Sequence, residues 1–419
     1  MKESSRSLAF AALKRWRNGT DFADKIVGES FARSPLASSD RAFAVELFYG
    51  VLRNLTLLDF WIAQLRSEPV DPRTRDLLRL GLYQVLLIET AAHAAVFETV
   101  ELAPARVRSL VNAILRRSLR EKLRLTNAAA AESLSVRFST PAFLIEKWSG
   151  QFGAAQVVKL CQWNNRPPPV YVRINRLKTT AAEFLIRYPG SALLPGTQNF
   201  VRLPDPFAAL ENGDCYIQDP STALACELLR PRAGESVLDA CAAPGGKTIY
   251  LAEMMQNEGA IVVADLNENR LQRLRDNLAR LEVRNVRTVR CDWRDESSIQ
   301  SAPFRARSFD KILLDAPCTN TGVMRRRVDL RWRLRPEDFS RMHRLQLEIL
   351  RAVVPLLKPG GSLVYSTCSL EREENAEVIE TFLGEERGFR LTRFEETLPF
   401  RDSLDGAFAA RLELSASGS

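Results

Sequence analysis

Six side chains capable of chemistry follow short apolar runs in the second half of the chain. They are four acids and two cysteines, namely Asp239, Asp265, Asp292, Asp315, Cys318 and Cys368. The apolar runs alternate with segments of helical spacing, which predicts an α/β fold with a mostly parallel sheet covered on both faces. Ligands bind at the carboxyl ends of the strands in such a sheet. We therefore expect all six side chains at one edge, although any single acid there can instead cap a helix.

The turn after the first expected strand has the composition of a ligand loop. The sequence from Val237 to Thr248, VLDACAAPGGKT, predicts a strand, a tight turn of small residues and the start of a helix. Its adjacent glycines do not form the dinucleotide fingerprint, and a phosphate loop needs glycine where Cys241 stands. A turn without a phosphate cradle suits S-adenosylmethionine (SAM). The alternative is an ordinary Gly-Pro turn between a strand and a helix.

Two acids at later strand ends suit the rest of this ligand. Asp265 follows Gly246 by about 20 residues, the spacing at which an acid reaches the ribose hydroxyls of a bound nucleoside. Asp292 ends the next strand, where we expect it beside the adenine. The turn and the two acids together predict a SAM site.

The two cysteines would give this site a nucleophile. Carbon 5 of cytosine attacks a methyl sulfonium poorly, but it becomes enamine-like when a thiolate adds to carbon 6. A base then removes the carbon 5 proton and the thiol leaves. Such a thiol ionises more readily near positive charge or a helix N-terminus, and Asp315 is placed to hold the N3/N4 edge of the pyrimidine. These arguments do not choose between Cys318 and Cys368, and a free cysteine is more commonly a small buried hydrophobic residue.

Composition and charge limit the possible partners. The net charge of +8 and the pI near 9.2 suit an anionic partner. The seven cysteines form no C-x-x-C pair and the two histidines are far apart in sequence, so we expect no disulfide framework and no metal site. We find no apolar run of transmembrane length and no leader pattern. We therefore expect a cytoplasmic, monomeric protein that does not bind membranes.

The first part of the chain predicts helices. Apolar residues recur at helical spacing through residues 1–130, as in Phe43, Leu47 and Val51. Residues 125–140 are small and polar and predict a linker, and the segment that follows predicts a small α+β module. We therefore expect three parts: an all-α domain at 1–130, the linker and the α+β module at 131–230, and the sheet domain at 231–419.

Two basic clusters are candidates for contact with RNA. The first closes the last helical stretch and consists of Arg116, Arg117, Arg120, Lys122 and Arg124. A solvated helix face is an equal alternative for it. The second surrounds Trp332 and consists of Arg325, Arg326, Arg327, Arg331, Arg333 and Arg335. Its position soon after Cys318 favours an RNA groove, with arginines on phosphates and the tryptophan stacked on an unpaired base.

Several of these segments resemble known families. SSDRAFAVELFYGVLRN and VNAILRR resemble the RNA-binding helical domain of the antitermination factor NusB. DACAAPGGKT, DAPC and YSTCS resemble the Sun (NSUN-type) family of RNA cytosine-5 methyltransferases. The resemblance covers nearly the whole chain and implies a Rossmann-like, SAM-dependent methyltransferase sheet. With the NusB-like front domain, it implies methylation of carbon 5 of a cytosine in 16S (small-subunit) ribosomal RNA.

The resemblance also implies roles for individual residues. Cys368 becomes the nucleophile, and Cys318 assists release of the methylated RNA. The family often has DAPCSG where this chain has DAPCTNTG, so Asn320 stands at a position where glycine would leave the loop free. The residues implied to bind SAM are Cys241, Ala242, Ala243, Pro244, Gly245, Gly246, Lys247, Asp265, Asp292 and Asp315.

Three alternatives remain open on the sequence. The same reaction on transfer RNA is separated from the ribosomal reaction only by the NusB-like front domain. A non-catalytic RNA-binding assembly factor could keep SAM as a structural ligand, but it would need neither Cys318 nor Cys368. A nucleoside triphosphatase is disfavoured because Cys241 replaces the glycine of a phosphate loop.

Overall fold

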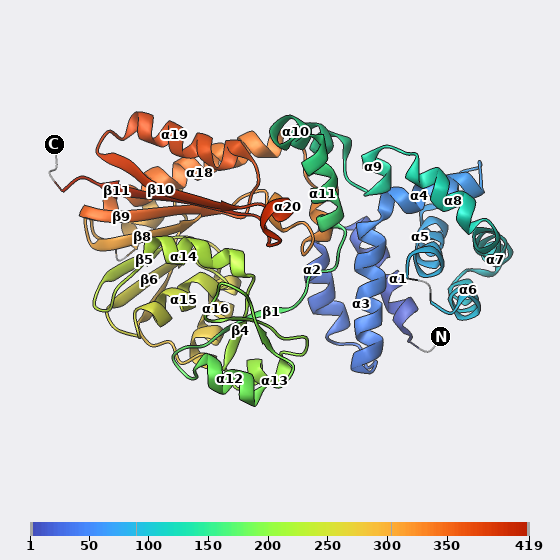
Figure 1. Cartoon of the computed structure of the whole chain (residues 1–419), viewed down its shortest axis with the longest axis horizontal. Coiled ribbons are helices and arrows are strands. Elements are labelled where there is room, and N and C mark those ends of the chain that lie inside the picture. Colours follow the sequence, from blue (N-terminus) through green and yellow to red (C-terminus); the bar gives the residue numbers. More distant parts are fainter. Residues whose placement is uncertain (1–2, 89, 303, 417–419) are drawn as a thin grey trace. The chain divides into compact units, whose positions relative to one another are not determined.

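The computed structural model describes residues 3–88, 90–302 and 304–416 (Figure 1). The chain divides into two compact units. The first consists of Met1–Pro167 and Met324–Leu334, and the second of Pro168–Val323 and Arg335–Ser419. The chain therefore enters the second unit, returns to the first for a short segment, and then completes the second.

The first unit is helical throughout its described residues. Its helices are α1 (Ser5–Asn18), α2 (Ala23–Ile26), α3 (Ser38–Arg53), α4 (Leu55–Leu65), α5 (Pro72–Leu82), α6 (Ala92–Glu101), α7 (Ala105–Arg120), α8 (Lys122–Ala130), α9 (Leu134–Arg137), α10 (Ala142–Phe152) and α11 (Ala154–Asn164), with π-helices at Val27–Phe31 and Tyr83–Leu87 and a 3-10 helix at Val328–Trp332. The helical prediction for residues 1–130 is confirmed.

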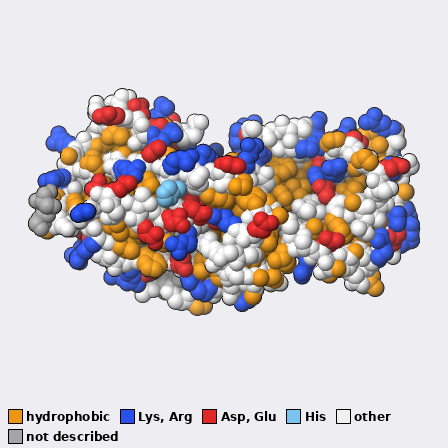
Figure 2. Space-filling view, turned by 90° about the horizontal axis from the view of Figure 1, so that it is seen from above, with side chains coloured by type: hydrophobic (Ala, Val, Ile, Leu, Met, Phe, Trp, Pro, Cys, Tyr) orange, Lys and Arg blue, Asp and Glu red, His pale blue; other side chains and the backbone are white. Residues whose placement is uncertain are grey.

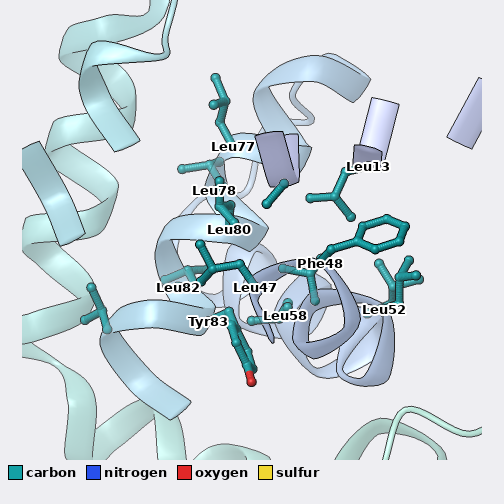
Figure 3. Packing of buried hydrophobic residues seen from close by; sticks show 14 of the residues in the cluster. Leu13, Leu47, Phe48, Leu52, Leu58, Leu77, Leu78, Leu80, Leu82 and Tyr83 are labelled. Carbon is teal, nitrogen blue, oxygen red and sulfur yellow. The ribbon is translucent and has the colours of Figure 1, made fainter. Parts of the chain in front are cut away.

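One apolar core holds these helices together. Figure 3 shows Leu47, Phe48 and Leu52 of α3 gathered with the leucines of α5 and with Leu13 of α1, all of them buried. The start of α5 is fixed by Asp71, whose side chain accepts hydrogen bonds from two N–H groups of the first turn. The helical spacing of apolar residues in the sequence thus corresponds to the buried faces of the helices.

The prediction of a linker at residues 125–140 is wrong. The segment forms the end of α8 and all of α9. Alanine is the strongest helix former, and the run of four alanines at 128–131 falls mostly within α8. Leu125 and Ala129 lie one turn apart and are buried in the core of the first unit. Small residues indicated flexibility in the sequence, but here they permit close helix packing.

The segment Met324–Leu334 is part of the first unit, and the RNA contacts predicted for Arg325, Arg331 and Trp332 are wrong. Arg331 is fully buried and donates to the backbone oxygens of Ser139 and Asn164 at 3.2 and 3.0 Å. The indole nitrogen of Trp332 donates to the backbone oxygen of Leu52 at 2.8 Å. Arg325 is also buried and lies over the ring of Trp163. These side chains hold protein backbone and rings, and of the six arginines only Arg327 and Arg335 are fully exposed.

The second unit begins with a small antiparallel sheet in the order β2-β3-β1-β4. Its elements are β1 (Tyr171–Ile174), α12 (Ala181–Arg187), β2 (Ala192–Leu193), β3 (Phe200–Arg202), α13 (Phe207–Glu211) and β4 (Cys215–Ile217). Arg173 of β1 is fully buried; it donates to Gln218 Oε1 at 2.7 Å and forms an ion pair with Glu253 of the sheet domain. Because both charges are buried, each needs the other, and the pair fixes this module to the sheet domain.

A seven-stranded sheet forms the body of the second unit, in the order β10-β11-β9-β8-β5-β6-β7. The pairs from β9 to β7 are parallel, which confirms the predicted mostly parallel sheet, while β10 and β11 add an antiparallel edge. The elements are α14 (Ala223–Leu229), β5 (Ser236–Asp239), α15 (Gly246–Met254), β6 (Ala260–Asp265), α16 (Glu268–Arg280), β7 (Val286–Arg290), α17 (Glu296–Ser301), β8 (Phe309–Asp315), α18 (Glu337–Val353), β9 (Leu357–Thr367), α19 (Ala376–Glu385), β10 (Phe389–Thr397), α20 (Pro399–Asp402) and β11 (Ala407–Leu414), with 3-10 helices at Pro220–Thr222, Thr321–Val323, Val354–Leu356 and Arg372–Glu374.

Helices cover both faces of this sheet, as predicted. α18 and α19 lie on one face, and α14, α15 and α16 lie on the other (Figure 1). Leu238 packs with the first pair of helices and its neighbour Val237 with the second group. Successive strand residues point to opposite faces, so the central strands must be apolar on both.

One expected boundary is wrong. The sequence Lys-Pro-Gly-Gly at 358–361 predicts the end of a long helix, but it lies inside β9, and α18 has already ended at Val353. Gly360 has φ +76°, and the pairing of β8 with β9 shifts register between Phe309 and Lys311. The glycine provides a bulge at the start of the strand.

The buried position of Arg331 yields a testable expectation. Replacing Arg331 with Met should lower the free energy of unfolding by about 3 kcal/mol, because several buried oxygens lose their donor. Arg335→Met is the matched control, since Arg335 is exposed, and it should change stability little. Urea denaturation of both variants makes the comparison. Equal stability of the two variants would contradict the structural role of Arg331.

Candidate active site

The turn after β5 brings backbone close to the start of α15. Gly245 has φ +105°, a conformation that favours glycine, and it caps the helix. A Cβ atom on Gly246 would lie 2.9 Å from a ring carbon of Tyr216, so this position has no room for a side chain. Residues 241–247 therefore form a compact turn beneath the N-terminus of a helix. The turn supplies backbone donors at the helix N-terminus, which suit an anionic group such as a carboxylate.

Asp239, at the end of β5, is a buried carboxyl group beneath this turn. Thr248 donates to its Oδ2 at 2.7 Å, while Oδ1 has no hydrogen-bond partner among the described residues. Burial raises the pKa of Asp239 to about 7, and the Thr248 hydrogen bond works in the opposite direction. The carboxyl group supports the turn from below.

Asp265 and Asp292 lie at neighbouring strand ends. Asp265 accepts from the backbone nitrogens of Ala243 and Asn267 at 3.3 and 2.9 Å, so it is held against the turn. Asp292 is fixed by both ends of the Arg294 guanidinium, which, as a hydrogen-bond donor, lowers the pKa of that carboxyl. Leu266 directly follows Asp265 and is 49% exposed. An apolar surface flanked by two acids suits a nucleoside, with the acids near hydroxyls and the leucine against a base.

The two predicted thiols are in contact. Cys318 Sγ and Cys368 Sγ lie 3.4 Å apart, although 50 residues separate them in the chain. The loop after Cys318 returns to Cys368, because Gly322 N–H donates to the backbone oxygen of Cys368 at 2.9 Å. A Cβ atom on Gly322 would lie 2.7 Å from that oxygen, so the approach requires glycine. The contact with Cys368, followed by burial, raises the pKa of Cys318 well above its ordinary value.

Asp315 and Lys247 form an ion pair at the same edge. Lys247 Nζ lies 2.5 Å from Asp315 Oδ1, which also accepts from Ser366 Oγ at 2.8 Å. Burial alone would lower the pKa of Lys247, but the charge of Asp315 and its hydrogen bond raise it overall. The ammonium group therefore stays charged and also interacts electrostatically with Cys368. Its positive charge is the feature that a reactive thiol requires.

Glu374 is a part of the site that the sequence did not indicate. Its buried carboxylate accepts from the backbone nitrogen of Thr319 at 2.8 Å and from the Ser369 hydroxyl at 2.7 Å. It also accepts from the Thr319 hydroxyl and from Gln346. Thr319 directly follows Cys318 and Ser369 directly follows Cys368, so one carboxylate fixes both loops. A short glutamate-rich stretch in the sequence gave no signal for this role.

Comparisons with known proteins agree with this geometry. The profile of the 16S rRNA methyltransferase RsmB/F family matches residues 226–413, that of the NusB family residues 3–120, and that of the RsmF/B-like ferredoxin-like domain residues 140–188. The chain is 34% identical over 405 residues to the probable ribosomal RNA small subunit methyltransferase B of Bacillus subtilis, covering 93% of this chain and 90% of that protein. The chain belongs to the 16S rRNA methyltransferase RsmB/F family.

Further relatives extend the likeness over the whole chain. The ribosomal RNA small subunit methyltransferase B of Salmonella paratyphi B is 36% identical over 400 residues, covering 90% of this chain and 91% of that protein. The crystal structure of PH0851 has a TM-score of 0.78 at 25% identity and covers 99% of both chains. The resemblance stated from the sequence, including its NusB-like front domain and its Rossmann-like methyltransferase sheet, is confirmed. Membership of this methyltransferase family implies the use of SAM.

Three further observations concern the surface charge, metal ligands and membrane helices. On the face in Figure 2, Lys and Arg side chains are interspersed with Asp and Glu, so the positive charge does not form a single uniform patch there. Among the described residues, no group of three His, Cys, Asp or Glu side chains is arranged to hold a metal ion. Within the same residues, no helix is long and apolar enough to cross a membrane.

The pKa of Asp239 gives a pH-dependent expectation. The pKa of Asp239 is about 7 in the folded protein and 3.8 in the unfolded chain, so the folded state binds the carboxyl proton more tightly. The stabilisation is present at acid pH and is lost as the pH rises from about 4 to 7, by roughly 4 kcal/mol in all. Asp239→Asn lacks this titration, so its stability relative to wild type should rise over that range. Urea denaturation between pH 5 and 8 tests it, and parallel pH profiles would refute the assignment.

Proposed function

We propose that this protein uses SAM to methylate carbon 5 of a cytosine in 16S ribosomal RNA through a covalent adduct on Cys368. The observation that carries the proposal is the contact between the Cys318 and Cys368 thiols at the sheet edge that also holds the Lys247–Asp315 pair. A protein that only binds RNA has no need of two adjoining thiols beside a buried lysine.

The SAM site uses the turn and the two acids. The turn at residues 241–247 faces the methionine part, Asp265 accepts from the ribose hydroxyls, and Leu266 with Asp292 receives the adenine. SAM supplies the methyl group. The contacts that already fix Asp265 and Asp292 pre-orient both carboxylates for this ligand, which supports the assignment.

The raised pKa of Cys318 supports different roles for the two thiols. A thiol that stays protonated is a poor nucleophile, so Cys318 is unsuited to the attack. Cys368 adds its sulfur to carbon 6, carbon 5 then takes the methyl group, a base removes the carbon 5 proton, and the bond from carbon 6 to sulfur breaks. Asp315 holds the N3/N4 edge of the pyrimidine, and Cys318 assists release of the product.

RNA contact is proposed for the remaining parts of the chain. The all-α domain at 1–130 and the module at 131–230 bind RNA, and the methyltransferase domain at 231–419 follows them in the sequence. In the basic cluster at the end of α7, Arg117 and Arg124 both form ion pairs with Glu121. The exposed Arg116 and Arg120 are therefore the stronger candidates for contact with phosphate. The target base must leave its stack to reach Cys368. The cytoplasmic location, the monomeric state and the absence of a metal remain predictions from the sequence.

Methyl transfer to defined RNA tests the proposal. Wild type and Cys368→Ala are incubated with labelled SAM and unmodified, protein-free 16S ribosomal RNA, and the nucleosides are then analysed. We expect 5-methylcytosine from wild type and at least a thousandfold less from Cys368→Ala, because the alanine cannot form the adduct. A methylated base other than 5-methylcytosine would refute the reaction. If transfer RNA tested in parallel gained 5-methylcytosine and 16S ribosomal RNA did not, the proposed substrate would be wrong.

A further inference from the structure

The side chain of Asn320 contacts both cysteines of the site, through the Cys368 thiol and the Cys318 backbone oxygen. It lies in the loop between β8 and the 3-10 helix at Thr321–Val323, with φ +59°. Asparagine is among the few residues other than glycine that adopt this left-handed conformation readily. The side chain is therefore placed in the site without distortion of the loop.

The orientation of its carboxamide is fixed by two hydrogen bonds. Asn320 Nδ2 donates to the backbone oxygen of Cys318 at 2.6 Å, and Asn320 Oδ1 accepts from Cys368 Sγ at 3.1 Å. The opposite orientation would bring two acceptor oxygens to 2.6 Å of each other, which is repulsive. A carboxamide oxygen can accept but cannot donate. The Cys368 proton therefore lies between its sulfur and Asn320.

This placement also orders the contact between the thiols. Since Cys368 has a single S–H proton and directs it at Asn320, Cys318 must be the donor in the 3.4 Å contact between the sulfurs. Cys318 thus donates a hydrogen bond to Cys368, and Cys368 donates one to Asn320. If Cys368 lost its proton with Asn320 in place, the negative sulfur would face the carboxamide oxygen at 3.1 Å. The two would repel each other, since both are acceptors.

We infer that Asn320 is a positioning residue that holds the Cys368 thiol in a hydrogen bond until an RNA base enters the site. The inference rests on the proposed function, in which Cys368 is the nucleophile. On entry of the base, the carboxamide turns away, the Cys368 proton passes to solvent, and the freed sulfur attacks. Lys247 then faces a thiolate, and Cys318 donates to it. The enzyme without RNA thus keeps its nucleophile unreactive toward other electrophiles.

Substitution by glycine tests this inference without straining the backbone. Asn320→Gly removes the carboxamide and keeps a residue suited to φ +59°. Ser403→Gly is the matched control, because Ser403 also has positive φ but lies in the exposed turn before β11.

The measurement is alkylation of the full-length protein by iodoacetamide without SAM or RNA. Peptide mass spectrometry follows Cys368 from pH 6 to 9. We expect Asn320→Gly to react at least fivefold faster than wild type at pH 7, with its pH–rate profile displaced to lower pH. Ser403→Gly should react at the same rate as wild type. The buried Cys161 and Cys226 report general loosening in the same samples.

Two results would overturn the inference. The first is an Asn320→Gly profile that coincides with wild type. The second is equal acceleration at Cys161, Cys226 and Cys368, which would show a loosened fold. Because the assay contains no RNA, its outcome is independent of the methyl-transfer experiment. Faster alkylation in a protein that forms no 5-methylcytosine would leave the thiol arrangement standing and refute the proposed reaction.

Discussion

The parallel pairing of β8 with β9 is the constraint on which the site depends. It places Asp315 opposite Ser366, so the chain leaves both strands at the same height and reaches its two cysteines within three residues. A shift of one residue in this register would turn the side chains to the opposite face. The loop through Gly322 then closes the remaining gap, because its N–H bonds to the Cys368 backbone. The contact between the thiols is thus a consequence of strand pairing and of one glycine.

Charges buried beside this edge give the two loops their fixed positions. Glu374 gathers donors from the residues that directly follow each cysteine, and burial raises its pKa even though these hydrogen bonds act to lower it. Lys247 keeps its charge because Asp315 is adjacent. A half-satisfied network would cost more than an apolar core of the same shape. The hydrogen bonds from Thr319 and Ser369 to Glu374 fix the two loops that carry the sulfurs.

The sequence predicted the sheet because its periodicity is local. The strand ending at Asp265 and the strand ending at Asp315 have the expected bounds, and the four acids and two cysteines do lie at strand ends. The sequence failed where the outcome depends on distant partners. Arg331 could be assigned to backbone oxygens only once α9 and α11 were in place. Glu374 and the carboxamide of Asn320 likewise acquire their roles from residues about 50 positions away.

The most direct test of the account is the capture of the covalent intermediate. Removal of the thiol that assists release should leave the RNA attached to the nucleophile. In Cys318→Ala, incubated with SAM and 16S ribosomal RNA, we expect a protein–RNA adduct that resists denaturation and maps to Cys368 by mass spectrometry of the nuclease-treated peptide. Cys368→Ala should form none. An adduct in Cys368→Ala, attached to Cys318, would reverse the two roles and contradict the assignment of the nucleophile.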